Sequence, residues 1–193
     1  MIGQRKSQCK PEVRVVGIDA SLTGTGVCCS KDGIFNAMFL PESKLRGADR
    51  LLSLRNRLFQ LIDAFKPELV VIEGYSYGSV GKDFEIGELG GVIKVELRER
   101  EIPFEVVSPK SLKKFMGVKR DGKELMVAAV KNRLKFDVGN NDNLADATAL
   151  ARVAEVIITN ETKYRSELEV VRDMATSKVP KKHEKFPKCR GML

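Results

Sequence analysis

The sequence predicts an α/β domain built on a mixed five-stranded sheet, with three antiparallel strands followed by parallel strands and helices on both faces. Three short apolar stretches open the fold, at 13–19, 26–30 and 34–40, and an Asp-Gly pair between the last two is a strong hairpin signal. Strand and helix patterns alternate after this meander. Such alternation indicates a sheet that becomes parallel and is covered by helices.

Two later apolar runs are the predicted parallel strands, at 68–73 and 104–107. The first reads ELVVIE, and a short continuous apolar run of this kind is typical of a strand buried on both faces. A helix over 47–66 precedes it, because apolar residues recur there at three- and four-residue spacing until Pro67 stops the pattern. The remaining predicted helices span 83–100, 110–115, 123–134 and 142–159.

The length of 193 residues suits one domain with a core of its own. We expect a basic N-terminal arm over 1–12, a folded domain over 13–160 and a basic, flexible C-terminal tail over 161–193. No apolar stretch reaches the roughly 18 residues that span a bilayer, and the polar start predicts no signal peptide. The four cysteines lack paired zinc spacing, so we expect reduced thiols in a cytoplasmic protein without membrane contacts.

The chain is basic, with 34 Lys and Arg residues against 26 Asp and Glu residues and a net charge of +8. One segment, 109–135, holds nine basic and two acidic residues, which matches nearly all of this excess. Such a segment favours a polyanionic partner such as nucleic acid. Charge alone does not distinguish this from a basic protein that binds no nucleic acid.

Four acids lie where predicted elements begin or end. Asp19 ends the first strand and Glu73 ends the fourth. Asp142 and Asp146 share one side at the start of the last helix, because they are four residues apart. Small neighbours such as Ala145 let that helix lie close to the sheet. If the first and fourth strands are neighbours, the four carboxylates converge.

Four carboxylates in one cleft repel one another strongly unless cations lie among them. Mg²⁺ suits such oxygen ligands, and two ions about 3.5–4 Å apart would hold the attacking water and the leaving oxygen of a phosphodiester. The acids therefore predict a two-metal site. Each also has a structural interpretation, with Asp19 in a turn, Glu73 as a surface charge and Asp142 as a helix cap.

Five stretches resemble the RuvC-type Holliday-junction resolvases in their order and spacing: GIDASLTGTG, VVIEGYSYG, ELGGVIKVELRE, VSPKSLKKFMG and DNLADATALA. Together they cover about residues 13–159. The resemblance implies an RNase H-like fold and a homodimer. It also implies the use of Mg²⁺ or Mn²⁺ to nick two opposed strands of a four-way DNA junction, leaving 5′-phosphate and 3′-hydroxyl ends.

The same resemblance makes Asp19, Glu73 and Asp146 catalytic metal ligands. Many members of this family have the fourth acid three residues before the last one, where this chain has Asn143. Asp142 lies one residue earlier, and we assign it as the fourth catalytic ligand. Three alternatives stay open: a nuclease of the same fold for flaps or forks, one for RNA–DNA hybrids, and a non-catalytic protein that binds branched DNA.

The predicted DNA contacts lie in a glycine-rich loop and in the basic segment. The resemblance implies that Tyr75 or Tyr77 stacks on an exposed base at the branch point, the alternative being ordinary loop tyrosines. The predicted phosphate contacts are Lys110, Lys113, Lys114, Lys119, Arg120 and Lys123. Lys131, Arg133 and Lys135 are interpreted as a solvated face.

Overall fold

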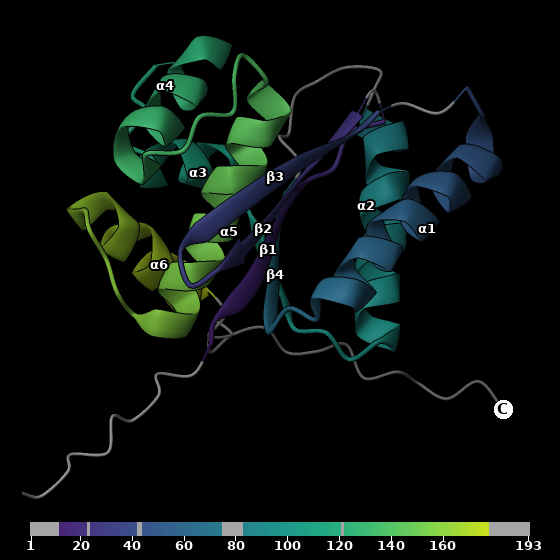
Figure 1. The fold of residues 1–193 in the computed structure, drawn as a ribbon, viewed down its shortest axis with the longest axis horizontal. Helices are drawn as coiled ribbons and strands as arrows, with labels where there is room; N and C mark the ends of the chain where they lie inside the picture. Colours follow the sequence, from purple (N-terminus) through teal and green to yellow (C-terminus); the bar gives the residue numbers. More distant parts are fainter. Residues whose placement is uncertain (1–11, 23, 42–43, 75–82, 121, 178–193) are drawn as a thin grey trace, which may run out of the picture.

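A mixed sheet forms the centre of the molecule in this computed structural model, which describes residues 12–22, 24–41, 44–74, 83–120 and 122–177. Its strands are β1 Arg14–Asp19, β2 Gly24–Lys31, β3 Ile34–Pro41, β4 Leu69–Glu73 and β5 Phe104–Val107. They lie in the order β3-β2-β1-β4-β5 (Figure 1). The β1–β2 and β2–β3 pairs are antiparallel, whereas β1–β4 and β4–β5 are parallel. The predicted fold class is confirmed.

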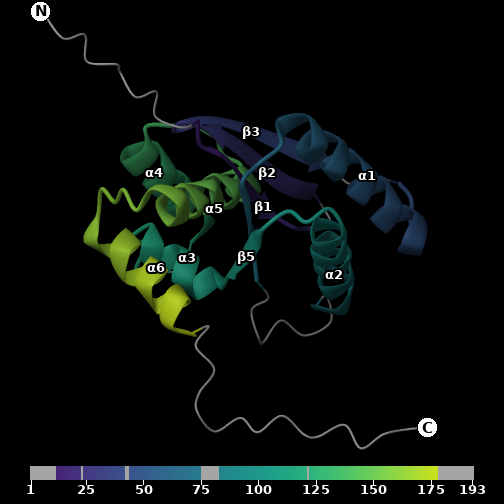
Figure 2. The same cartoon turned by 90° about the horizontal axis from the view of Figure 1, so that it is seen from below.

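Helices cover both faces of the sheet (Figures 1 and 2). They are α1 Gly47–Phe65, α2 Asp83–Glu99, α3 Pro109–Phe115, α4 Lys123–Leu134, α5 Asp142–Thr159 and α6 Arg165–Ser177. One face packs on α1 and α2, where Leu54 and Ile93 are buried with Val16 of β1. The other face packs on α5, which α3, α4 and α6 surround (Figure 2). None of the helices in the described part of the chain has the length and apolar character needed to cross a bilayer.

The backbone of α5 lies directly against β1 and β2. A Cβ on Gly17 would be 2.1 Å from the carbonyl oxygen of Ala147, and one on Gly26 would be 2.2 Å from that of Asn143. Side chains are therefore excluded from both strand positions. Because Asp19 is the cross-strand partner of Gly26, this contact brings the first turns of α5 to the end of β1.

The helices and strands predicted between 13 and 159 are all present, and their ends differ from the prediction by at most two residues. Apolar spacing and turn residues were sufficient to predict these elements. Each of them buries an apolar face in one of the two main core clusters or in the sheet between them.

The chain after residue 160 differs from the predicted flexible tail. Residues 165–177 form α6, which packs on α3 and α5 and contributes to the same core. Its main anchor is Glu167, which is 1% exposed and accepts hydrogen bonds from Arg152. Arg152 also donates to Glu155, which accepts from Ser30 of β2. The stretch is polar on average, and its few apolar residues, Val170, Val171 and Met174, pack on the core from one side of the helix. The prediction of a tail followed the polar composition and overlooked this spacing. Residues 1–11 and 178–193, the rest of the predicted arm and tail, lie outside the described residues.

Candidate metal centre and basic hollow

Three of the four predicted acids meet at one end of the sheet. Asp19 is the last residue of β1 and Glu73 the last of β4, and these neighbouring strands run parallel, so both acids lie at the same edge. Asp146 reaches this edge from the second turn of α5. One carboxylate oxygen from each residue lies within 4.8 Å of the other two. We call these three residues the acid cluster.

The acid cluster is electrostatically unstable without a cation. Burial, followed by the negative charges of Asp19 and Asp146, raises the pKa of Glu73 to about 9, while the positive charge of Lys113 lowers it. At neutral pH a proton on Glu73 therefore relieves the repulsion. A divalent cation would relieve it instead and let all three carboxylates ionise. Three converging carboxylate oxygens fit Mg²⁺ or Mn²⁺, which are hard cations that prefer oxygen ligands.

Asp142 does not belong to the acid cluster, so three carboxylates converge among the described residues and not the four expected. It lines a separate hollow of about 640 Å³ together with Glu124 and Lys131. The residue of α5 that faces β2 is Asn143, whose Nδ2 donates a 2.7 Å hydrogen bond to the carbonyl oxygen of Gly24. Successive helix residues lie about 100° apart, so Asp142 and Asn143 cannot both face the strand.

A basic hollow of about 820 Å³ lies beside the acid cluster, between α3, the loop that follows it, α4 and the start of α6. Its cationic lining consists of Lys110, Lys113, Lys114, Lys119, Arg120 and Arg133, and none of the described residues that line it is acidic. Lys113 links the two sites, because its charge lowers the pKa of Glu73. The hollow is complementary in charge to a phosphate backbone that passes the acid cluster.

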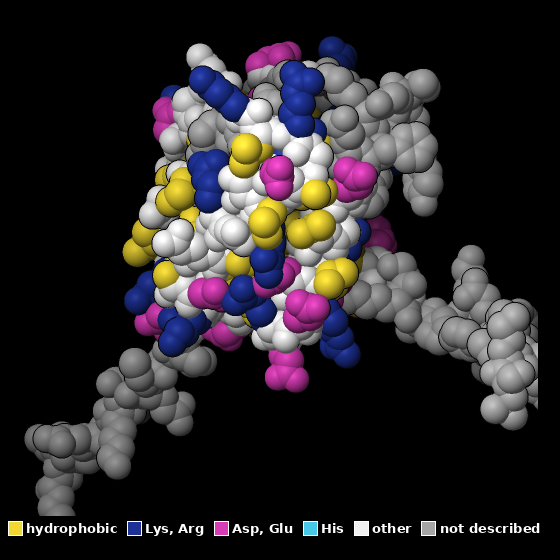
Figure 3. Space-filling view, turned by 90° about the vertical axis from the view of Figure 1, so that its right-hand side faces the viewer, with side chains coloured by type: hydrophobic (Ala, Val, Ile, Leu, Met, Phe, Trp, Pro, Cys, Tyr) yellow, Lys and Arg dark blue, Asp and Glu magenta, His cyan; other side chains and the backbone are white. Residues whose placement is uncertain are grey.

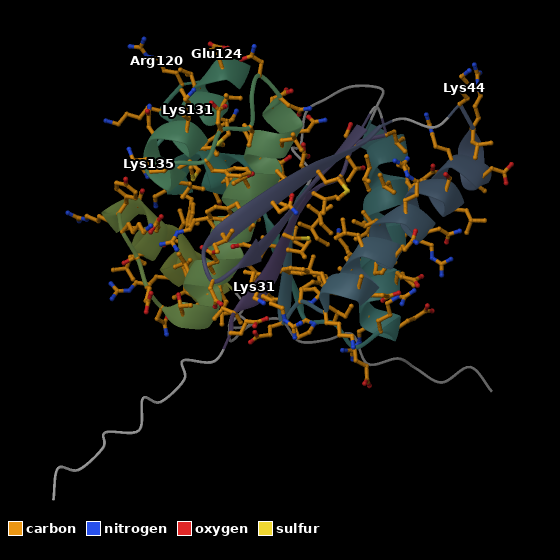
Figure 4. The ribbon with its side chains drawn as sticks, viewed as in Figure 1. Lys31, Lys44, Arg120, Glu124, Lys131 and Lys135 are labelled. Carbon is orange, nitrogen blue, oxygen red and sulfur yellow. The ribbon has the colours of Figure 1, made fainter. Side chains whose placement is uncertain are left out.

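The predicted phosphate contacts differ in their surroundings. Lys110, Lys119 and Arg120 are exposed, and Figure 4 shows Arg120 projecting away from the ribbon near α4. Lys114 instead pairs with two acids of α6, Asp173 at 3.1 Å and Glu169 at 3.7 Å. Lys114 therefore holds α6 on α3 as well as lining the hollow.

The three residues interpreted as a solvated face also differ. Lys131 and Lys135 project from the surface, and Lys131 pairs with Asp137 at 2.7 Å (Figure 4). Arg133 is only partly exposed and donates to the carbonyl oxygen of Phe115 at 3.1 Å. The interpretation of Arg133 as a solvated residue is therefore wrong, because spacing on one helix does not show contacts with other elements.

Three predicted DNA contacts cannot be placed. Tyr75, Tyr77 and the side chain of Lys123 lie outside the described residues. They remain predictions.

A sheet that brings three acids together beside a basic hollow defines a class of protein, the enzymes that cleave phosphodiesters with divalent cations. Comparison with known families shows which family within this class the chain belongs to. The model of the family "Crossover junction endodeoxyribonuclease RuvC" matches residues 15–154, and the chain belongs to this family.

Curated relatives and solved structures agree with the family. The chain is 28% identical over 143 residues to the crossover junction endodeoxyribonuclease RuvC of Hydrogenovibrio crunogenus, covering 70% of this chain and 83% of that protein. It is also 28% identical over 165 residues to RuvC of Caldicellulosiruptor saccharolyticus, covering 80% and 99%. Thermus thermophilus RuvC, solved with a Holliday-junction substrate, has the same fold with a TM-score of 0.63, 20% identity and coverage of 76% and 96%.

The substitution Glu73→Gln tests the electrostatics of the acid cluster. Because the folded-state pKa of Glu73 is raised above its ordinary value of 4.5 to about 9, the folded protein without metal binds more protons than the unfolded chain between these pH values. Its stability should therefore fall as pH rises through this window, and Gln should remove that slope. We expect the variant to melt higher than wild type at pH 9 in EDTA, by about 2–4 °C for each kcal/mol of repulsion removed.

Thermal melts at pH 6 and pH 9, with EDTA or with Mg²⁺, check this expectation. Mg²⁺ should stabilise the wild type strongly at pH 9 and the variant weakly. Equal pH slopes for the two proteins in EDTA would show that Glu73 does not carry the strain of the cluster.

Proposed function

We propose that this protein resolves Holliday junctions as a homodimeric endonuclease that uses Mg²⁺ or Mn²⁺, with two ions in each active site. The main support is the acid cluster, which lies at the ends of two adjacent strands in a chain of the RuvC family. The relatives are named crossover junction endodeoxyribonucleases, and one neighbouring structure holds a Holliday-junction substrate. Because DNA is the substrate, we place the reaction in the cytoplasm of a bacterial cell or of a phage-infected host.

Each member of the acid cluster has a proposed role. Asp19 is the most buried of the three, and its strand β1 lies against both β4 and α5, which carry the other two acids. Asp19 would therefore hold cations together with each of them. Glu73 and Asp146 would complete their coordination from either side. Bound divalent cations activate the attacking water and neutralise the leaving oxygen. Glu73 releases its proton when it becomes a ligand, which makes cation binding tighter at higher pH.

The basic hollow would hold the DNA backbone that leads to the acid cluster. Lys110, Lys113, Lys119 and Arg120 are the proposed phosphate contacts, and they position the DNA without selecting a base sequence. Stacking by the loop tyrosines and a phosphate contact by Lys123 remain part of the proposal. Lys114 has a smaller share in DNA binding, because α6 already neutralises it.

Asn143 is the proposed fourth polar residue of the site in place of Asp142. Its Nδ2 is used by the carbonyl oxygen of Gly24, so its Oδ1 is the atom suited to face a cation. Asn143 precedes Asp146 by three residues and lies on the same side of α5. A neutral oxygen there gives the site one negative charge fewer than four acids would, and it should bind the second ion more weakly.

The outer side of α2 is the proposed dimer surface. Within the described part of the chain, no atom outside the local backbone lies within 4 Å of where a Cβ on Gly87 or Gly91 would lie. Val95, one turn further on, is 59% exposed. These residues are four apart and share one side of the helix. Figure 3 shows hydrophobic side chains gathered in the middle of the face on which α1 and α2 lie. Glycines there let a second copy of the helix approach closely.

Replacement of Asp19 or Asp146 by Asn tests the catalytic assignment. We expect either variant to lose at least about 10³-fold in cleavage rate, because a metal ligand is lost, while junction binding in Ca²⁺ is unchanged. Gel assays with labelled junctions, flaps, forks, duplexes and RNA–DNA hybrids measure both properties and define the substrate. Full junction cleavage by either variant would disprove the active site. Wild-type cleavage of hybrids alone would replace the substrate, and binding without cleavage in Mg²⁺ or Mn²⁺ would favour a non-catalytic protein.

The matched pair Asn143→Asp and Asp142→Asn separates the two candidates for the fourth position. Asn143→Asp adds a negative charge to the site and should tighten Mn²⁺ binding about tenfold. This factor corresponds to the free energy of about one contact with a charged group. Asp142→Asn should leave Mn²⁺ affinity within about twofold, because Asp142 lies in another hollow. Isothermal calorimetry measures both affinities. The opposite ranking would restore Asp142 as the ligand.

Val95→Glu tests the dimer surface. Two copies of the new charge would face each other across a two-fold axis, so we expect a monomer in size-exclusion chromatography with light scattering. Ile34→Glu is the control. Ile34 is 75% exposed at the start of β3, which is an edge strand of the sheet. It should leave the oligomeric state unchanged. A wild-type monomer, or a dimer of Val95→Glu, would contradict the proposed surface.

A further inference from the structure

We propose that Arg133 is a preorganised phosphate-binding residue of the basic hollow, and that residues 161–177 hold it in place. This inference rests on the proposed function and adds to it a DNA contact and a role for α6. The stretch that holds Arg133 lies beyond residues 15–154, the part of the chain that matches the family.

The guanidinium group of Arg133 is fixed on several sides. Its Nη1 donates hydrogen bonds of 3.1 Å to the carbonyl oxygen of Phe115 and of 3.1 Å to Oγ of Ser166. The ring of Tyr164 lies under the guanidinium carbon, 4.2 Å from it to the ring centre. Gly117 closes another side, where a Cβ would lie 2.1 Å from Nη2. Arg133 is therefore held in one orientation before any ligand binds.

The fixed orientation presents Arg133 to an anion. The group lines the basic hollow of about 820 Å³ and also the adjoining hollow of about 460 Å³. Both of its hydrogen bonds to described residues use Nη1, and Nη2 packs against Gly117, so Nε is the donor left for a phosphate oxygen. An arginine already held in place loses little side-chain entropy on binding, and its planar group suits phosphate.

The support for Arg133 is itself firmly attached to the domain. Ser166 donates a 2.9 Å hydrogen bond to the carbonyl oxygen of Phe115, so it joins α6 directly to the end of α3. One residue further on, Glu167 is buried against Arg152 of α5. The first turn of α6 is thereby fixed to α3 and α5. The residues that hold Arg133 therefore belong to the rigid part of the domain.

The path of the DNA follows from the residues that line the hollow. Val107 is the cross-strand partner of Glu73, and α3 begins two residues after it, so the hollow starts beside the acid cluster. Lys113 of α3 and Arg133 of α4 both line this hollow. A strand whose scissile phosphate lies at the acid cluster would therefore place a phosphate further along the same backbone on Arg133. Lys131, two residues earlier on α4, pairs with Asp137 and lines the hollow that contains Asp142 and Glu124. It is the matched control, with equal charge on the same helix but acidic surroundings.

Anisotropy titrations of a labelled four-way junction in Ca²⁺, at several salt concentrations, test the inference. Arg133→Ala should weaken binding about tenfold and lower the salt slope by about 0.9, the value of one phosphate contact. Arg133→Lys should keep the slope and lose affinity, because an ammonium cannot make the same set of contacts. Tyr164→Leu should weaken binding severalfold with an unchanged slope. Lys131→Ala should change affinity less than twofold.

Melting temperatures and cleavage separate the possible failures. A purely structural role would lower the melting temperature of Arg133→Ala and leave the salt slope of the folded fraction at the wild-type value, which would overturn the inference. Equal affinity and slope for Arg133→Ala and Lys131→Ala would also overturn it. If the wild type binds DNA but cuts no junction, the proposed function fails, while a reduced slope for Arg133→Ala would still support Arg133 as a phosphate contact.

Discussion

The contact between α5 and the first two strands is the constraint on which the site depends. At Gly17 and Gly26 the strands meet the helix backbone itself, with no side chain between them. Larger residues at these positions would push α5, and Asp146 with it, away from the strand ends. Here Asp146 shares a cluster with Asp19 and Glu73 because the helix lies so near to the sheet. Packing of small residues thus determines which acids can share an ion.

The same packing holds together charges that repel one another. Asp19 is buried, and the pKa of Glu73 rises to about 9 because of burial and its acidic neighbours. Core contacts on both faces of the sheet oppose this repulsion, since two large apolar clusters pack there. The fold therefore favours a protonated Glu73 as long as no cation is bound. A divalent cation would displace this proton, so its affinity would depend on pH.

The predictable parts of the site are residues whose place within a single strand or helix is enough to mark them. Asp19 and Glu73 are each the last residue of an apolar run, and a charge in that place has few explanations besides a turn or a site. Asp146 follows from its position on a helix rich in alanine. The mixed character of the sheet could be predicted as well, because of the hairpin signal and the later alternation of elements. That β1 and β4 are neighbours was only a condition at that stage, and the structure supplies it.

The parts that could not be predicted depend on how two elements meet. Asp142 and Asn143 both lie one turn before Asp146, and only the contact with Gly24 shows which of them faces the sheet. The anchor of α6 is a buried acid, which in the sequence resembles any solvated Glu. Arg133 looked like one of several surface cations for the same reason. Its neighbours come from two distant stretches of the chain, 115–117 and 164–166, so the role of this one basic residue becomes visible only in the folded structure.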